Sequence, residues 1–153
     1  MDIQIINPLD YPDWDALLVA CPGYSFFHSS AWARVLHETY RYTPLYFTVF
    51  DNGQLRALIP VMEVSSFLTG KRGVSLPFTD YSDAIIGDGI SFKNLLDHIR
   101  EYGENHGWRT LELRGGQNLR PLGPASPPFS RHILNLSSKA DEVFSGFTLH
   151  ESP

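Results

Sequence analysis

The sequence predicts a mixed α/β domain in which a sheet is flanked by helices. Three observations carry this expectation: a β-hairpin signal, a long stretch with helical periodicity, and an irregular alternation of helical and extended segments. The hairpin signal is Asn52-Gly53, which separates two runs rich in aromatic and branched residues, Leu45–Phe50 and Leu55–Val64. Asn-Gly between apolar runs is the strongest short-range sign of a hairpin. Pro60 within the second run indicates an edge position or a bulge there.

The clearest helix is predicted over Ser91–His106. Ser91 can cap its start and Gly107 can end it. The apolar residues of this stretch repeat at helical spacing: Phe92, Leu95, Leu96, Ile99 and Tyr102. Because such helices interleave irregularly with strands, the sequence favours a mixed sheet with helices on its faces over a doubly wound parallel sheet.

The remaining segments complete this pattern. A second helix, capped by Ser29 or Ser30 and running to about Tyr40, carries the apolar positions Trp32, Val35 and Leu36. The other expected elements are a strand over Ile3–Ile6, a helix over Asp10–Ala20, a strand over Thr110–Arg114 with alternating polarity, a strand over His132–Leu136 and a helical piece over Ala140–Phe147.

Composition bounds the class of protein. The 153 residues are 42% hydrophobic and 19% charged, which is typical of a single globular domain spanning residues 1–153. The formal net charge of −5 and the lack of a basic stripe argue against a nucleic-acid partner. No run reaches the roughly 20 apolar residues of a membrane span, and the N-terminus does not resemble a signal peptide. With a single cysteine, Cys21, these features predict a cytoplasmic protein.

The sequence carries no convincing cofactor or metal motif. Nucleotide-binding glycine patterns and a nucleophile elbow are absent, and the six histidines show no metal-ligand spacing. The segment Arg120–Ala125 fits the letters of an acetyl-CoA loop, Arg/Gln-x-x-Gly-x-Gly/Ala. Such a loop binds pyrophosphate through backbone N–H groups at a helix N-terminus, and Pro121 and Pro124 remove two of those donors. We therefore predict no cofactor and no metal.

The most informative stretch is Gly73–Ile86, in which two short apolar runs flank a polar knot. The knot contains Asp80, Tyr81 and Asp83, and Pro77 excludes a helix at its entry. Loops on rigid scaffolds are a common place for binding residues. The alternative is an ordinary polar turn, since Asp, Ser and Thr favour turns for local hydrogen bonding.

Several segments taken together resemble the FemAB-like family of aminoacyl and acyl transferases. Phe26–Trp32 is similar to the polar-Ser-x-x-Trp opening of a family helix, and Gly73–Asp80 to the family's glycine-to-proline segment ending in Asp. The hairpin ending in Ile59–Val61, the strand Thr110–Gly116 and the crossover His132–Phe147 follow in the family's order. Members of this family consist of two halves, each of GNAT acetyltransferase fold. The resemblance thus implies that this chain is an N-terminal half.

The resemblance also implies residue roles. Asp80 matches the aspartate of the precursor-binding cleft and would orient an acceptor amine or accept its proton. Tyr81 and Asp83 sit beside it, and Tyr81 would hydrogen-bond the acceptor. Arg114 would meet an anionic group, or pair with Asp80 or Asp83. Leu36 stands where peptidoglycan-precursor enzymes often have a lysine, and Arg114-Gly115-Gly116 replaces the family's Asp-Pro. Both departures weaken a cell-wall precursor as substrate.

Two functional hypotheses follow. In the first, the chain is the substrate-binding half of a FemAB-like N-acyltransferase and takes a small-molecule or cell-envelope precursor as substrate. In the second, it is a non-catalytic GNAT-like module that binds a ligand or a protein through the face the other half would cover. Because such a face is apolar, we expect a homodimer with Ala140–Phe147 at or near the contact. No functional role is assigned to Trp32, which is more simply a core residue. None is assigned to His28, which can cap a helix or pack in the core.

Overall fold

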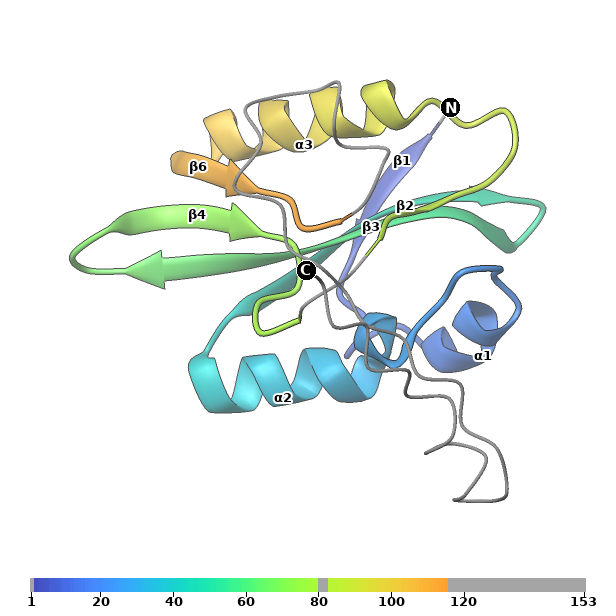
Figure 1. The fold of residues 1–153 in the computed structure, drawn as a ribbon, viewed down its shortest axis with the longest axis horizontal. Helices are drawn as coiled ribbons and strands as arrows, with labels where there is room; N and C mark the ends of the chain where they lie inside the picture. The colour runs from blue at the N-terminus through green and yellow to red at the C-terminus, as the bar shows by residue number, and fades with distance from the viewer. Residues whose placement is uncertain (1, 80–82, 116–153) are drawn as a thin grey trace, which may run out of the picture. The chain divides into compact units, whose positions relative to one another are not determined.

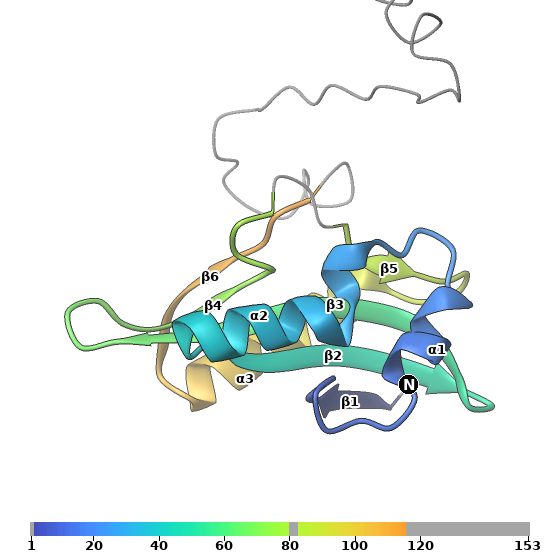
Figure 2. The same cartoon turned by 90° about the horizontal axis from the view of Figure 1, so that it is seen from below.

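Residues 2–79 and 83–115, the part described by the computed structural model, form one six-stranded sheet with helices on both faces (Figures 1 and 2). The strands are β1 (Ile3–Ile6), β2 (Thr43–Asp51), β3 (Gln54–Ser66), β4 (Gly70–Val74), β5 (Ile85–Ile86) and β6 (Trp108–Glu112). The helices are α1 (Trp14–Val19), α2 (Ser30–Tyr40), α3 (Phe92–Asn105) and a short 3-10 helix, η1 (Phe26–His28). This architecture confirms the predicted mixed α/β fold.

The sheet is mixed: most of its strands are antiparallel, but the last strand, β6, runs parallel to its neighbour β4. The order is β1-β2-β3-β4-β6, with antiparallel pairing from β1 to β4 and a parallel pair between β4 and β6. A parallel pair needs a crossover connection, and the chain supplies it through β5 and α3.

The long strand β3 has two successive partners on one edge. Its far end, Met62–Ser66, pairs with β4, whereas Ala57 and Leu58 near its start pair with β5. β2 lies along its other edge. Among the described strands, none pairs with the stretch 59–61 on the edge shared by β4 and β5. Pro60 falls in this stretch, which agrees with the edge position that its missing N–H predicted.

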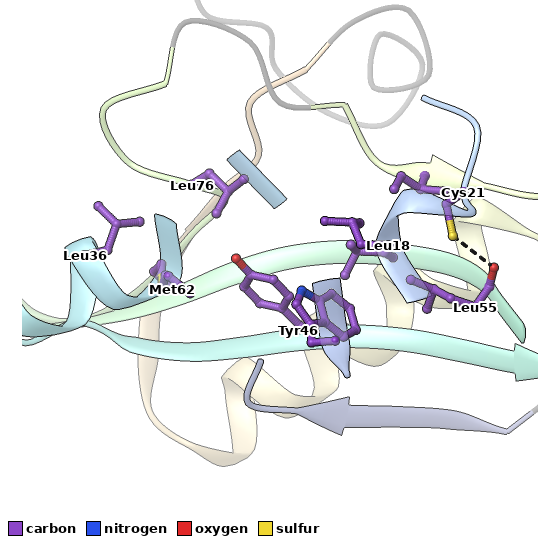
Figure 3. Packing of buried hydrophobic residues seen from close by; sticks show 11 residues of the cluster. Leu18, Cys21, Leu36, Tyr46, Leu55, Met62 and Leu76 are labelled. Atoms are coloured by element: carbon purple, nitrogen blue, oxygen red, sulfur yellow. Dashed lines mark hydrogen bonds between the residues drawn. The ribbon is translucent and has the colours of Figure 1, made fainter. Parts of the chain in front are cut away.

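Two hydrophobic clusters fill the two faces of the sheet. α1 and α2 cover one face and α3 covers the other (Figure 1). The first cluster packs α1 and α2 against β2 and β3. Its members include Trp14, Leu36, Tyr46, Met62 and Leu76. Figure 3 shows this cluster, with Leu36, Met62 and Tyr46 arranged along the sheet below Leu76. The second cluster packs the α3 residues Leu95 and Ile99 on Phe47, Ile59 and Val61.

The local signals in the sequence are realised in the structure. Asn52 and Gly53 form a two-residue turn at φ values of 49° and 76°, which is the geometry that Asn-Gly permits. The Oγ atoms of Ser29 and Ser91 accept hydrogen bonds from the backbone N–H groups of Trp32 and Asn94, so both predicted caps are present. Gly107 ends α3 with φ 74°.

Other expectations need correction. The helix predicted over Asp10–Ala20 is restricted to Trp14–Val19, because Asp13 adopts a left-handed conformation with φ 57° and the helix starts after it. In α2, Val35 is 44% exposed, and the buried face is formed by Ala33 and Leu36 instead. The last described strand begins at Trp108 rather than at Thr110.

The strand expected over His132–Leu136 and the helical piece over Ala140–Phe147 lie outside the described residues. The single domain predicted over 1–153 therefore stays a prediction. No helix within the described ranges has the length and apolar character needed to cross a membrane.

Candidate functional site

The segment that follows β4 is buried although it is a loop. Leu76 is fully buried in the first hydrophobic cluster (Figure 3), and the side chains of Ser75 and Thr79 are 3% and 4% exposed. Phe78 is the exposed member of the segment, at 57%. Loops normally run over the surface, where water satisfies their backbone groups. Burial of this loop requires its polar groups to find partners within the protein, and those partners define the site.

Two residues of the loop hold a left-handed backbone. Leu76 has φ 39° and Phe78 has φ 63°, on either side of Pro77. A non-glycine residue at positive φ is uncommon and costs on the order of 1 kcal/mol. Here the strained conformation is held in place by the packing of Leu76 in the first cluster. The Thr79 hydroxyl also holds it by donating to the Leu76 carbonyl at 2.8 Å. Strained backbone that its surroundings hold firmly is characteristic of binding and catalytic loops.

Arg114, which follows the end of β6, anchors this loop. Its backbone N–H donates to the Oγ of Ser75 at 2.7 Å, and the Ser75 N–H donates to the Glu112 carbonyl at 2.9 Å. Its side chain reaches further: Nε donates to the Glu112 carboxylate at 2.8 Å, and Nη1 lies 3.4 Å from the Thr79 carbonyl. The Arg114 guanidinium thus contacts Thr79, the residue that immediately precedes Asp80 in the sequence.

On the other side of the 80–82 segment, Asp83 contacts His28. The His28 Nε2 lies 2.9 Å from the Asp83 carbonyl oxygen. The two residues line a cavity of about 320 Å³ together with Pro22, Gly23, Ser25 and Ala84–Ile86. The cavity is therefore lined by two segments that are far apart in the sequence, 22–28 and 83–86.

His28 is held in one tautomer by its surroundings. Its ring is 1% exposed, and its Nδ1 accepts from the backbone N–H of Ser25 at 3.0 Å, closing a capping box at the start of η1. Nδ1 therefore carries no proton, and Nε2–H donates to the Asp83 carbonyl. Burial lowers the pKa of His28, although the hydrogen bonds to Asp83 and Ser25 and the Asp83 charge oppose the shift. The ring is neutral and structural in this arrangement.

The predicted site residues divide between described and undescribed parts of the chain. Asp80 and Tyr81 lie outside the described residues. Asp83 contacts His28, whereas Arg114 contacts Thr79 and forms its ion pair with Glu112, not with Asp83. The convergence of Asp80, Tyr81, Asp83 and Arg114 on one surface stays a prediction.

Sequence reasoning did not identify the connection from His28 to Asp83. Ser25-x-x-His28 is a local capping pattern that the sequence does contain, and it accounts for one of the histidine's contacts. The other contact joins residues 55 positions apart, and no local pattern indicates it. In the part of the chain that the structure describes, no group of three or more His, Cys, Asp or Glu residues is arranged to hold a metal ion.

Among the described residues, two buried side-chain polar atoms have no hydrogen-bond partner: the Tyr46 hydroxyl and the Trp32 Nε1. Tyr46 belongs to the first cluster, and Trp32 packs against that cluster, as its interpretation as a core residue predicts. Burial raises the pKa of Tyr46, and the charge of Asp15 adds to this effect. The phenol therefore stays protonated and serves as an apolar filler of the core.

Comparison with known proteins supports the fold and not a closer relationship. No family model matches the sequence, and no curated protein matches it. Among solved structures, a ribosomal-protein-alanine N-acetyltransferase from Brucella melitensis is 14% identical with a TM-score of 0.55, covering 89% of this chain and 100% of its own. An aminoglycoside acetyltransferase from an uncultured soil metagenomic sample is also 14% identical, with a TM-score of 0.56 and coverages of 89% and 98%.

A predicted acetyltransferase from Clostridium acetobutylicum, solved with acetyl-CoA, is 12% identical with a TM-score of 0.50 and coverages of 87% and 96%. At such identities the similarity concerns the fold alone. The predicted GNAT-like fold class is confirmed: the mostly antiparallel sheet with its helices is the fold of GNAT acetyltransferases.

Proposed function

We propose that the chain is the substrate-binding half of a FemAB-like N-acyltransferase that acts on an amine acceptor. The observation that carries this proposal is the strained loop Ser75–Thr79, buried except at Phe78, which leads directly into Asp80 and Tyr81. Support also comes from the shared fold, because the structures that share it include enzymes named as acetyltransferases of a ribosomal protein's alanine and of aminoglycosides.

The loop suits the presentation of a carboxylate. Its start is fixed by hydrogen bonds of Ser75 with Glu112 at the end of β6 and with Arg114, and its end by the contact of Thr79 with Arg114. A segment that is already restrained before binding loses little conformational entropy when a ligand binds. Asp80 is proposed to orient the acceptor amine or take its proton, and Tyr81 to hydrogen-bond the acceptor.

Arg114 is proposed to meet an anionic group of the acceptor. Its side chain is 36% exposed and uses Nε and Nη1 for its described contacts, which leaves further N–H donors of the guanidinium for a ligand. Asp83 completes the proposed set on the other side of residues 80–82. A neutral amine would attack the activated acyl carbon, forming the C–N bond as the bond to the leaving group breaks and Asp80 takes the amine proton. Positioning and oxyanion stabilisation, rather than a protein nucleophile, would provide the rate.

The isolated chain is expected to bind an acceptor without transferring an acyl group to it. This expectation comes from the prolines of Arg120–Ala125, a segment outside the described residues, which remove N–H donors that a pyrophosphate needs. The alternative function, a non-catalytic GNAT-like binding module, shares this expectation and differs in its ligand. The test must therefore locate the ligand and establish its chemistry.

NMR titration with amine-bearing probes provides that test. Glucosamine and an alanine-initiated peptide are expected to shift the backbone amide signals of Thr79, Asp83 and Arg114, whereas N-acetylated forms of the same probes are not. Asp80→Asn should weaken binding by about tenfold, as loss of a charge-assisted hydrogen bond predicts. Asp88→Asn, which alters an exposed carboxylate in the turn before α3, is the matched control.

Shifts confined to other surfaces, or equal responses to amine and acetylated probes, would contradict the amine-acceptor site. Product formed from acetyl-CoA by the isolated chain would contradict the missing donor site. The cell-envelope precursor, the homodimer and the cytoplasmic location remain predictions. Light scattering tests the dimer directly, because the monomer mass is 17.3 kDa.

A further inference from the structure

The hairpin between β3 and β4 carries two large apolar side chains at its tip. Phe67 is 102% exposed and Leu68 is 85% exposed, so neither side chain contacts the rest of the described protein to a significant degree. Figures 1 and 2 both show this hairpin extending beyond the helices, away from the core. Single exposed apolar residues are ordinary, but two adjacent ones at the end of a projecting hairpin form a small apolar tip.

The tip is held by an ordered hairpin. The β3–β4 register continues to the Ser66–Gly70 pair, so only three residues lie between the paired strands. The Thr69 N–H donates to the Ser66 Oγ at 3.4 Å across this turn, and Gly70 has a positive φ of 78°. Phe67 and Leu68 are therefore presented at a fixed place rather than on a long loop.

Three cationic residues lie next to the tip of the hairpin. Lys71 and Arg72 follow the tip on β4, and Arg109 lies on the neighbouring β6. The Arg109 side chain packs over Gly70, where an added Cβ would come within 2.8 Å of its Nε. Lys71 forms an ion pair with Glu63 at 3.3 Å. Within the described residues, no ion pair involves Arg72 or Arg109, so both charges remain available to a ligand.

We propose that this tip, Phe67 and Leu68 with Lys71, Arg72 and Arg109 behind it, inserts into the headgroup region of an anionic lipid bilayer. Apolar side chains at the end of a protrusion enter the interface, while cations set back from them meet the phosphates of the lipids. A stable protein contact buries about 800 Å² on each partner, and a narrow, convex tip with two apolar side chains is poorly shaped for that.

The charge of the whole chain sharpens the inference. At −5 the protein as a whole is repelled by an anionic surface. Any preference for anionic lipid must then come from a local group of cations, and the hairpin base provides one. The proposal is independent of the acceptor site, because residues 67–72 make no described contact with Thr79, Asp83 or Arg114.

Vesicle co-sedimentation tests the proposal with the full chain. Wild-type protein is expected to bind vesicles containing about one third phosphatidylglycerol or phosphatidylserine more tightly than vesicles of phosphatidylcholine alone, and to be released by added salt. The double variant Phe67→Ser/Leu68→Ser should bind at least about tenfold more weakly. Arg72→Gln/Arg109→Gln should lose the preference for anionic lipid.

Val19→Ser is the matched control, because it removes a 62% exposed apolar side chain from α1, away from the hairpin. It should bind vesicles as the wild type does. Equal binding by the Phe67→Ser/Leu68→Ser variant and the wild type would overturn the proposal, as would the absence of wild-type binding. If light scattering instead shows a dimer that this double variant abolishes, the tip is a protein contact and the bilayer proposal is wrong.

Discussion

The Nε2 of His28 donates a hydrogen bond to the backbone carbonyl of Asp83 at 2.9 Å. This bond connects η1, near the start of the chain, to the segment that enters β5. Since the Nδ1 of the same ring accepts from the Ser25 N–H, both ring nitrogens are committed in the neutral form. A proton on Nδ1 would face an N–H donor, so charging the ring breaks the capping box.

Folding stability should therefore fall on mild acidification. Burial lowers the pKa of His28 in the folded state below its unfolded value of about 6.5. Between these two values the unfolded chain binds a proton that the folded chain does not. The free energy of unfolding is then highest above about pH 6.5 and decreases as the pH falls through 6.5 toward the folded pKa. Urea midpoints measured from pH 7.5 to 5 should show the decrease.

His28→Asn should flatten this pH dependence, because the amide oxygen can accept from Ser25 without titrating. His106→Gln is the control, since His106 is exposed at the end of α3. The same decrease in His28→Asn as in the wild type would show that another group is responsible.

Gly73 should not tolerate a methyl group. A Cβ at Gly73 would lie 2.2 Å from the Cζ3 of Trp108, whose indole is fixed by a 2.7 Å hydrogen bond from Nε1 to Glu63. Gly73→Ala should destabilise the protein by about 1–3 kcal/mol through overpacking. In a Trp108→Leu background the same substitution should cost less than half as much, which a double-mutant cycle in urea measures. An unchanged penalty would point to the backbone instead of the indole.

Ser75→Ala should loosen the loop after β4. The Oγ of the buried Ser75 accepts from the Arg114 N–H at 2.7 Å, and its loss leaves that part-buried donor without this partner. We expect a loss of about 1–3 kcal/mol in unfolding free energy, together with faster amide exchange at Arg114. Ser66→Ala removes an exposed hydroxyl with a long 3.4 Å contact and should change stability by less than about 0.5 kcal/mol. Equal effects of the two substitutions would contradict the anchoring role.

Cys21 should be inert toward thiol reagents in the folded state. Its side chain is buried in the first cluster, and its Sγ lies 3.4 Å from the Leu55 carbonyl (Figure 3). Burial raises the pKa of the thiol, so little reactive thiolate is present near neutral pH. Labelling with Ellman's reagent at pH 7.5 should proceed at the rate of unfolding and become fast in urea. Rapid labelling of the native protein would show that the core opens around Cys21.

The elements that the sequence predicted correctly are those with local causes. Asn52-Gly53, the Ser29 and Ser91 caps and the periodicity of α3 act within a few residues, so the sequence alone indicates them. Helical spacing predicts Val35 on the buried face of α2, because spacing alone does not distinguish it from Ala33. The position of the sheet determines that Ala33 is buried while Val35 is 44% exposed.

The candidate site was predictable only in outline. The sequence identified Arg114 and Asp83 as candidates, but their contacts with Thr79 and His28 depend on how β6 and η1 are brought to the loop. Nor did any pattern in the sequence indicate the left-handed conformations of Leu76 and Phe78, because leucine and phenylalanine rarely adopt them. Tertiary packing imposes such strain.

The two successive partners of β3 on a single edge have an evolutionary consequence. β4 and β5 each hold their own register on β3, so the chain between them is fastened to the scaffold at both ends. Substitutions, insertions or deletions between the fastened ends leave the pairing of both strands unchanged. Selection can therefore diversify the positions of this segment that lie outside the clusters, though not the buried Leu76 and Thr79, and with them ligand preference, while the sheet and its two clusters stay the same.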